Sequence, residues 1–158
     1  MDVGKQMRAG AAMGVFGDLI SEAVRTRAKD FFTFTLDYLP LAASATQTAT
    51  FAVDSDSDFM LCALAGLANV NATPATQVPF VHALVTLADT GSGRLFQSSA
   101  VHFNNLFGSG QFPGYLPYPK LIPRASAVRC TLQNLVATAI EVRLTFSGFK
   151  VFPMRESV

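Results

Sequence analysis

Residues 128–151, VRCTLQNLVATAIEVRLTFSGFKV, decide the fold of this chain because they contain two strands joined by a turn. Along residues 140–146, apolar side chains alternate with charged or hydroxyl-bearing ones, which is the period of a strand with one buried face. Residues 128–133 alternate in the same way, and residues 134–138 form the turn. The sequence therefore predicts a C-terminal antiparallel hairpin.

This last strand contains an irregularity at Gly148. An apolar residue is due at that position, and Phe149 and Val151 then continue the apolar pattern in the opposite phase. An inserted residue at a glycine produces such a change, so we predict a β-bulge at Gly148. Pro153 is expected to end the strand.

Strand-like patterns also occur upstream of the hairpin. Residues 59–64 are almost entirely apolar, which is typical of a strand buried on both faces, whereas residues 65–77 are small and polar and are expected to form a connection. Other strands are predicted at residues 31–38 (ending at Pro40), 48–53, 80–88 and 94–98, the last two joined by a turn at residues 89–93.

Seven or eight strands with turn-rich connections predict an all-β protein, an antiparallel β-sandwich closed as a jelly roll. An up-and-down barrel or another Greek-key sandwich stays open as an alternative, because periodicity does not reveal strand order. Residues 31–158 are expected to form this domain, and residues 1–30 an N-terminal arm with a short helix.

The arm and the helix differ in composition. Residues 1–17 contain four glycines and no strong period, which favours an extended arm. Asp18 is a suitable N-cap for a helix over residues 18–28 with its apolar side chains on one side. Three alternatives are open for this segment. Its apolar side packs on the chain's own sandwich, or it reaches a neighbouring subunit, or the segment is disordered.

Residues 103–124, FNNLFGSGQFPGYLPYPKLIPR, hold five aromatic residues and four of the chain's eight prolines. Proline fixes φ and has no amide hydrogen, so we expect no regular element to run through this segment. It is predicted to be an ordered loop that carries exposed or half-buried aromatic side chains. Loops of this length are usually functional.

The composition restricts the classes of function. Half of the residues are apolar, only 15% are charged, against about 25% in typical proteins, and the net charge is +1. This charge offers no electrostatic surface for nucleic acid, and no apolar run is long enough to span a membrane. A surface with so little charge favours burial against protein partners.

The residues that carry chemistry in other proteins form no recognisable site here. Motifs for an activated nucleophile or a zinc hydrolase are absent, and His82 and His102 have no orienting partner in sequence, so we expect no enzyme activity and no cofactor. Cys62 and Cys130 are expected to be buried free thiols, with a disulfide as the alternative. No metal site is predicted.

The segment 54–58, DSDSD, begins like a calcium-binding loop. The sixth position of such a loop requires glycine and the twelfth an acidic residue, but these positions hold Phe59 and Ala65. We therefore predict a polar turn, with a bound cation as the alternative.

Residues 78–152 resemble the carboxyl half of small virion proteins of tailed bacteriophages. The resemblance is carried by the turn DTGSGR at residues 89–94, by the aromatic loop that ends in LPYP at residues 116–119, and by the final hairpin with VRLTFSGFK at residues 142–150. A weaker similarity covers residues 31–59. This family implies a jelly-roll scaffold and a structural role in the virion.

The resemblance implies a capsid cement or decoration protein that binds the major capsid protein and other virion subunits. It also implies a homo-oligomer, dimer or trimer, located at the capsid surface of the virion after assembly in the host cytoplasm. A neck or tail component is an alternative, and so is a jelly-roll module that binds host glycans.

The interface residues follow from composition and from failure to fit the strand pattern. In the aromatic loop the candidates are Phe107, Phe112, Tyr115, Tyr118 and Leu121, and in the arm they are Met7, Met13 and Phe16. The alternative for the loop residues is that they close one end of their own sandwich.

Overall fold

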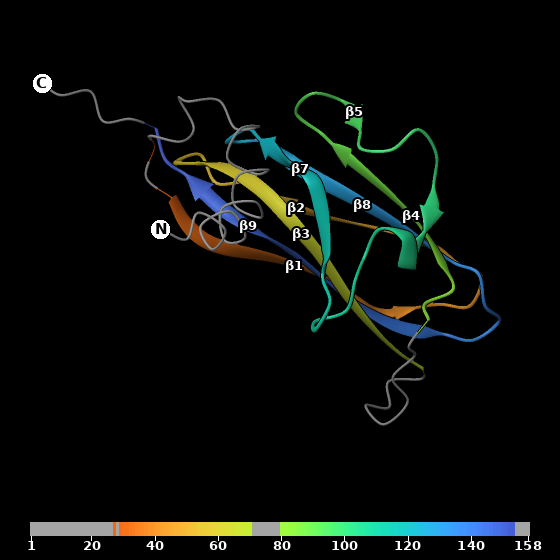
Figure 1. The fold of residues 1–158 in the computed structure, drawn as a ribbon. Coiled ribbons are helices and arrows are strands. Elements are labelled where there is room, and N and C mark those ends of the chain that lie inside the picture. The colour runs from red at the N-terminus through yellow and green to blue at the C-terminus, as the bar shows by residue number, and fades with distance from the viewer. Residues whose placement is uncertain (1–26, 28, 71–79, 154–158) are drawn as a thin grey trace, which may run out of the picture.

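The computed structural model describes residues 27, 29–70 and 80–153, which form two antiparallel sheets packed face to face (Figure 1). Sheet one has the order β1-β9-β3-β7, and sheet two the order β2-β8-β4-β5, with β6 also paired to β4. No helix in this part of the chain is long and apolar enough to cross a lipid bilayer. The strands are β1 (Lys29–Leu41), β2 (Thr46–Ala52), β3 (Asp58–Val70), β4 (Ala83–Asp89), β5 (Arg94–Leu95), β6 (Val101–His102), β7 (Gly114–Ile122), β8 (Ala127–Asn134) and β9 (Ile140–Val151).

The strand order confirms the predicted sandwich and identifies it as a jelly roll. From β1 to β4 and again from β7 to β9, each successive strand lies in the opposite sheet. The predicted C-terminal hairpin is therefore wrong, because β8 pairs with β2 and β4 whereas β9 pairs with β1 and β3. An up-and-down arrangement would instead pair each strand with the next one. The sandwich begins at Lys29, close to the predicted start at residue 31.

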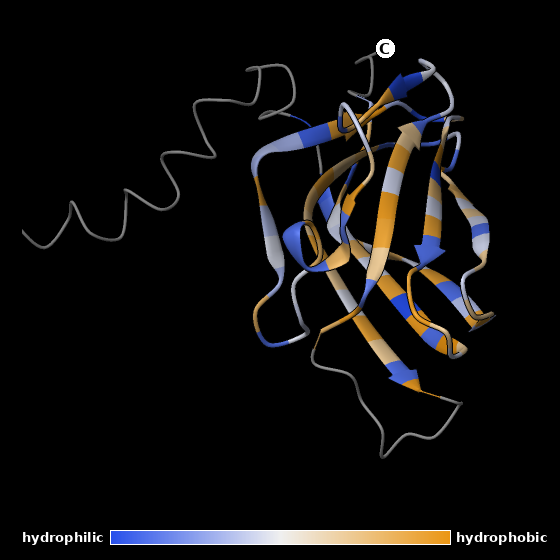
Figure 2. Ribbon diagram, turned by 90° about the vertical axis from the view of Figure 1, so that its right-hand side faces the viewer, coloured by the Kyte–Doolittle hydropathy of each residue, from blue (hydrophilic) through white to orange (hydrophobic). Residues whose placement is uncertain are grey.

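The core lies between the sheets and follows the alternation of the strands, seen as orange and blue bands along the ribbons in Figure 2. Aromatic rings fill one part of it: the rings of Phe34 and Phe51 stack at 4.4 Å, and Phe51 lies 4.9 Å from Phe146. Two buried polar side chains, Tyr38 and Asn134, make hydrogen bonds that connect the two halves of the sandwich. The Tyr38 hydroxyl donates to the Cys130 carbonyl at 2.7 Å, and the Asn134 amide donates to the Ala42 carbonyl at 3.0 Å.

The prediction of a bulge in β9 at Gly148 is wrong, because the inserted residue belongs to the partner strand β3. Leu61 lies opposite Gly148 and Ala63 opposite Ser147, so Cys62 is the inserted residue, while β9 stays in register with β1. The phase of β9 therefore does not change. Phe149 is apolar on the outer face of sheet one, and Gly148 is required because a Cβ there would collide with the carbonyl oxygen of Met60.

Several strand ends differ from the prediction: β4 begins at Ala83, β5 ends at Leu95, and β1 and β3 are longer than expected. Strand β1 continues through the cis Leu39–Pro40 bond to Leu41, with a register shift against β9 that accommodates the proline. Residues 65–70 extend β3 instead of forming a connection, because they pair with β9 as far as Ile140. The small side chains of these residues were the reason for predicting a connection. Residues 71–79 lie outside the described part.

The expectation that no regular element runs through residues 103–124 is wrong, because β7 contains Pro117 and Pro119. Two features make this possible. Strand β7 is the edge of sheet one, so one side of its backbone needs no partner. On the other side, Lys120 lies opposite Leu61 and Tyr115 opposite Ala63, so residues 116–119 bulge past Cys62 without regular pairing.

Replacing Gly148 by Ala tests the close contact between β9 and β3. The added methyl group would push against the backbone of Met60, so we expect a loss of about 1–3 kcal/mol in the free energy of unfolding. Gly110→Ala is the matched control, because its added methyl group would meet no other atom within 4 Å. Urea unfolding of both variants decides the point, and equal stability would contradict the proposed collision.

Candidate functional site

The structure separates the predicted loop residues into one core residue and several surface residues. Phe107 is buried, stacked on Phe103 at 4.9 Å and edge-on to Phe146 at 5.7 Å. Its assignment as an exposed anchor is wrong, because the short 3-10 helix at Phe103–Asn105 turns it into the sandwich. Phe112, in the loop before β7, is 80% exposed.

Tyr115 and Tyr118 are almost equally exposed, at 68% and 66%, but they do not form one patch. Tyr115 lies opposite Ala63, whose face of sheet one points away from the core. Tyr118 instead lines a hollow beside β5 with Leu95, Phe96 and others. The bulge at residues 116–119 therefore places the two rings in different environments. The candidates Met7, Met13 and Phe16 lie outside the described residues.

The outer face of sheet one carries an apolar row that crosses all four strands. Phe31, Phe149, Met60 and Leu121 are successive cross-strand partners, so their side chains share this face. The rings of Phe31 and Phe149 meet edge-on at 6.1 Å. Phe31 is 69% exposed and Leu121 42%, whereas Met60 is buried. We call these four residues the apolar row.

The remainder of this outer face has little charge. The next row contains Thr33, Ser147, Ala63 and Tyr115, and further along the strands Leu67 lies opposite Arg143. Arg143 and Asp37 form an exposed ion pair at 4.0 Å. Glu141 also lies on this face, opposite Asn69, so the face combines apolar and hydroxyl groups with a few charged ones.

The outer face of sheet two is different in character. Thr48, Thr131 and Thr86 lie side by side across β2, β8 and β4, and the Thr48 and Thr131 hydroxyls are 2.9 Å apart. Thr50 lies opposite Arg129. This is the usual composition of a solvated sheet face, so the apolar row distinguishes sheet one.

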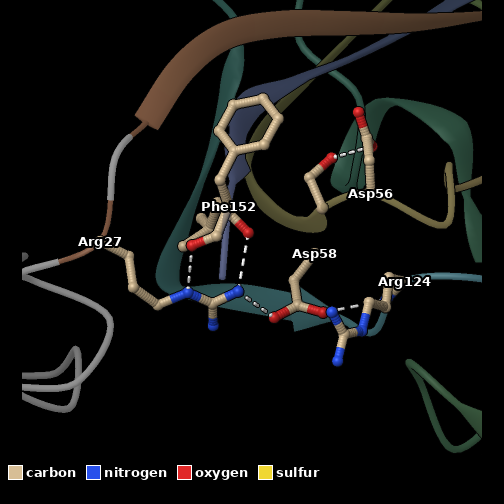
Figure 3. A network of polar contacts seen from close by, with 7 residues as sticks. Arg27, Asp56, Asp58, Arg124 and Phe152 are labelled. Atoms are coloured by element: carbon tan, nitrogen blue, oxygen red, sulfur yellow. Dashed lines mark hydrogen bonds and ion pairs between the residues drawn. The ribbon is translucent and has the colours of Figure 1, made fainter. Parts of the chain in front are cut away.

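Charged groups gather at the end of sheet one next to the apolar row (Figure 3). The guanidinium of Arg27 forms an ion pair with Asp58 at 2.7 Å and donates to the carbonyls of Val151 and Phe152. Asp58 also accepts a hydrogen bond from the backbone amide of Arg124 at 3.0 Å. The network joins Arg27, which precedes β1, to the first residue of β3 and the last residue of β9.

The DSDSD segment forms the predicted turn, and its carboxylates have separate partners. Asp54 forms an ion pair with Lys150 at 2.5 Å, and this hydrogen bond raises the pKa of Lys150. Asp56 accepts a hydrogen bond from the Ser57 hydroxyl, and Asp58 is held by Arg27. Among the described residues, no three acidic, histidine or cysteine side chains gather as metal ligands would.

Both thiols are free, but only Cys130 is fully buried. Burial raises the pKa of the Cys130 thiol to about 12. Cys62 is half-buried because the bulge leaves it between regular pairs, and burial raises its pKa as well. Its side chain packs against Met60 and Val151 on the outer face, so Cys62 belongs to the surroundings of the apolar row.

Sequence reasoning missed that Phe31, Met60 and Phe149 lie on the outer face of sheet one. The available signal was the presence of apolar residues in both phases of the same strand, as in Phe31 beside Phe32 and in the all-apolar run of β3. A strand that is apolar in both phases needs a cover on each face. One cover is sheet two, and the other is not part of the sandwich.

A polar hollow lies on the same outer face, beyond Tyr115. Ser109 and Gln111 from the loop face Arg143 and Thr145 of β9 across it. The backbone of Gly108 holds this loop on β3, through hydrogen bonds with Leu64 and Gly66. Ala65 of β3 lines this hollow and lies two residues from Ala63, the cross-strand partner of Tyr115, so the hydrogen-bonding side chains are on the same face as that exposed ring.

No family model and no curated protein matches this chain. Among solved structures, a chain from the crystal structure of an infectious bursal disease virus VP2 subviral particle is similar, with 10% sequence identity and a TM-score of 0.27. The similarity covers 80% of this chain and 42% of that chain. A TM-score this low supports no functional conclusion.

The core and surface positions of the loop are distinguished by two matched substitutions. Phe107→Ala should cost about 3–5 kcal/mol in the free energy of unfolding, because it removes a ring packed in the core. Phe112→Ala should change it by less than about 0.5 kcal/mol, because that ring is exposed. Thermal or urea unfolding measures both, and similar losses would contradict the assignment.

Proposed function

We propose that this chain is a structural protein of a virion, which attaches to the assembled shell as a capsid cement or decoration protein. The observation that carries the proposal is the contrast between the two outer faces of the sandwich. Sheet one presents the exposed rings of Phe31 and Tyr115 together with charged side chains such as Arg143 and Glu141, whereas sheet two presents threonines and Arg129 without an aromatic ring in these rows.

The chemistry of sheet one suits a protein interface. Tyr and Phe are enriched in protein interfaces, which matches the exposed rings of Tyr115 and Phe31 on this face. Attachment at many sites on one shell needs only modest affinity at each of them. A low content of charged residues, 15% of the chain, supports a surface that is covered in the assembly.

The fold is compatible with the virion role but does not decide it. Jelly rolls occur in viral capsids, and the same scaffold also serves lectins. The resemblance of residues 78–152 to small phage virion proteins favours a virion role over a lectin, without deciding between capsid, neck and tail. The arm at residues 1–17 is a second proposed attachment element, and the protein is proposed to act without catalysis.

Glycan binding is the second candidate, and the polar hollow beside Tyr115 favours it. Sugars bind where an aromatic ring lies near hydrogen-bonding side chains, and Gln111, Arg143 and Thr145 provide such groups. A sugar-binding module would bind free oligosaccharides, whereas a cement protein would bind assembled shells and ignore them. A neck or tail component is distinguished by its low copy number in particles.

The proposed attachment face is tested by Tyr115→Ala, with Tyr118→Ala as the matched control. The two rings are equally exposed but lie on different sides of β7. Loss of Tyr115 should weaken binding to purified shells about tenfold or more, as for an interface anchor, with little change in melting temperature. Tyr118→Ala should bind normally.

Each other outcome is also informative. Weaker binding by Tyr118→Ala alone would move the attachment surface to the hollow beside β5. Unchanged shell binding by both variants, together with oligosaccharide binding that depends on Tyr115, would replace the cement function by glycan recognition.

The arm is tested separately by deleting residues 1–17. We expect a folded domain with an unchanged unfolding midpoint but reduced incorporation into particles, measured as copies per shell by quantitative gel densitometry. Normal incorporation of the shortened chain would remove the arm from the proposal and leave the sandwich as the attachment element.

A further inference from the structure

Arg27 ties the beginning of the described chain to one end of the apolar row. Its guanidinium donates to the carbonyls of Val151 and Phe152 and pairs with Asp58, at 2.6 to 2.8 Å (Figure 3). Val151 and Asp58 are cross-strand partners and lie two residues from Phe149 and Met60, about 7 Å along the strands. The chain therefore enters the sandwich beside the row.

The residues just before Arg27 have the pattern of an amphipathic helix. Ile20, Ala23, Val24 and Arg27 have the spacing i, i+3, i+4 and i+7, which places them on one side of a helix. Leu19 borders this side, while Ser21 and Arg25 lie away from it. The anchored residue is thus on the same helical side as the apolar ones.

The lengths are also compatible. A helix of nine residues, 18–26, is about 14 Å long. The apolar row crosses four strands, and three interstrand spacings amount to about 14 Å. One short helix is therefore long enough to cover the row from one edge of sheet one to the other.

We propose that residues 18–26 dock as a helix on the apolar row of their own molecule, with Leu19, Ile20, Ala23 and Val24 against Phe31, Phe149 and Met60. The tether at Arg27 favours the molecule's own segment over a second copy, because it holds the segment at a high effective concentration next to the row. Docking would bury Phe31, which is 69% exposed to solvent.

This contact would divide the outer face of sheet one into two regions. The helix covers the apolar row, and the rows that carry Tyr115 and the polar hollow stay accessible. The docking itself does not rest on the proposed virion function.

The thiol of Cys62 reports on the docking. Cys62 packs against Met60, and its sulfur lies 3.5 Å from the Met60 carbonyl oxygen, so a helix on the row would shield it. In the full-length protein we expect Ile20→Asp to speed the reaction of Cys62 with a small maleimide about tenfold, equivalent to about 1.4 kcal/mol of shielding. Cys130 should stay unlabelled in the folded protein because it is fully buried.

Ser21→Asp is the matched control, because it adds the same charge on the other side of the helix and should leave the rate unchanged. Phe31→Ser changes the sheet's side of the proposed contact and leaves the core intact, because Phe31 is exposed. Its effect on the rate of Cys62 labelling should not add to that of Ile20→Asp. Labelling of Cys130 in a variant would reveal that this variant has lost its fold. If this occurs in Ile20→Asp, the rate of Cys62 labelling in Phe31→Ser decides whether a helix covers the row.

Two results would overturn the proposal. Equal Cys62 rates in the wild-type protein and in both Ile20→Asp and Phe31→Ser would show that nothing docks on the row. Protection that disappears on dilution would assign the contact to a second copy of the chain. Shell binding by Tyr115→Ala is measured independently, so failure of the virion function leaves this test unaffected.

Discussion

Strand β9 is paired along almost its whole length with β1 on one edge and with β3 on the other, and sheet one depends on this double pairing. Its inner side chains, from Ile140 to Phe146, supply the middle of the core. The carbonyl of Met60 approaches so closely at Gly148 that no side chain fits there. Because β9 is the last strand and β1 the first, the two ends of the domain close against each other.

The same pairing determines the surface of the molecule. Because β9 stays in register with β1, Phe149 is placed on the outer face opposite Phe31, and the bulge at Cys62 keeps Met60 on that face as well. The apolar row is therefore a consequence of register, and a shift by one residue would turn these side chains into the core. Function and fold are linked at this point, since the proposed attachment face is built on the strands that carry the core.

Much of the fold could be predicted from local pattern. The alternation along β8 and β9, the turn at DSDSD and the hairpin from β4 to β5 are confirmed, because each is encoded by neighbouring residues. The prediction was wrong at Pro117, Pro119 and Phe107. Whether a proline fits a strand depends on whether that strand is at an edge, and whether a phenylalanine is buried depends on which elements surround it.

The sequence by itself determined that the chain is an all-β protein with few charged residues, because strand period and composition are local properties. The tertiary structure alone decided which strands are neighbours, and with it the jelly-roll order, the edge position of β7 and the bulge at Cys62. It also decided that Phe31, Phe149, Met60 and Leu121 form one row. These residues come from four strands, and only the hydrogen-bonded register between those strands brings their side chains to the same face.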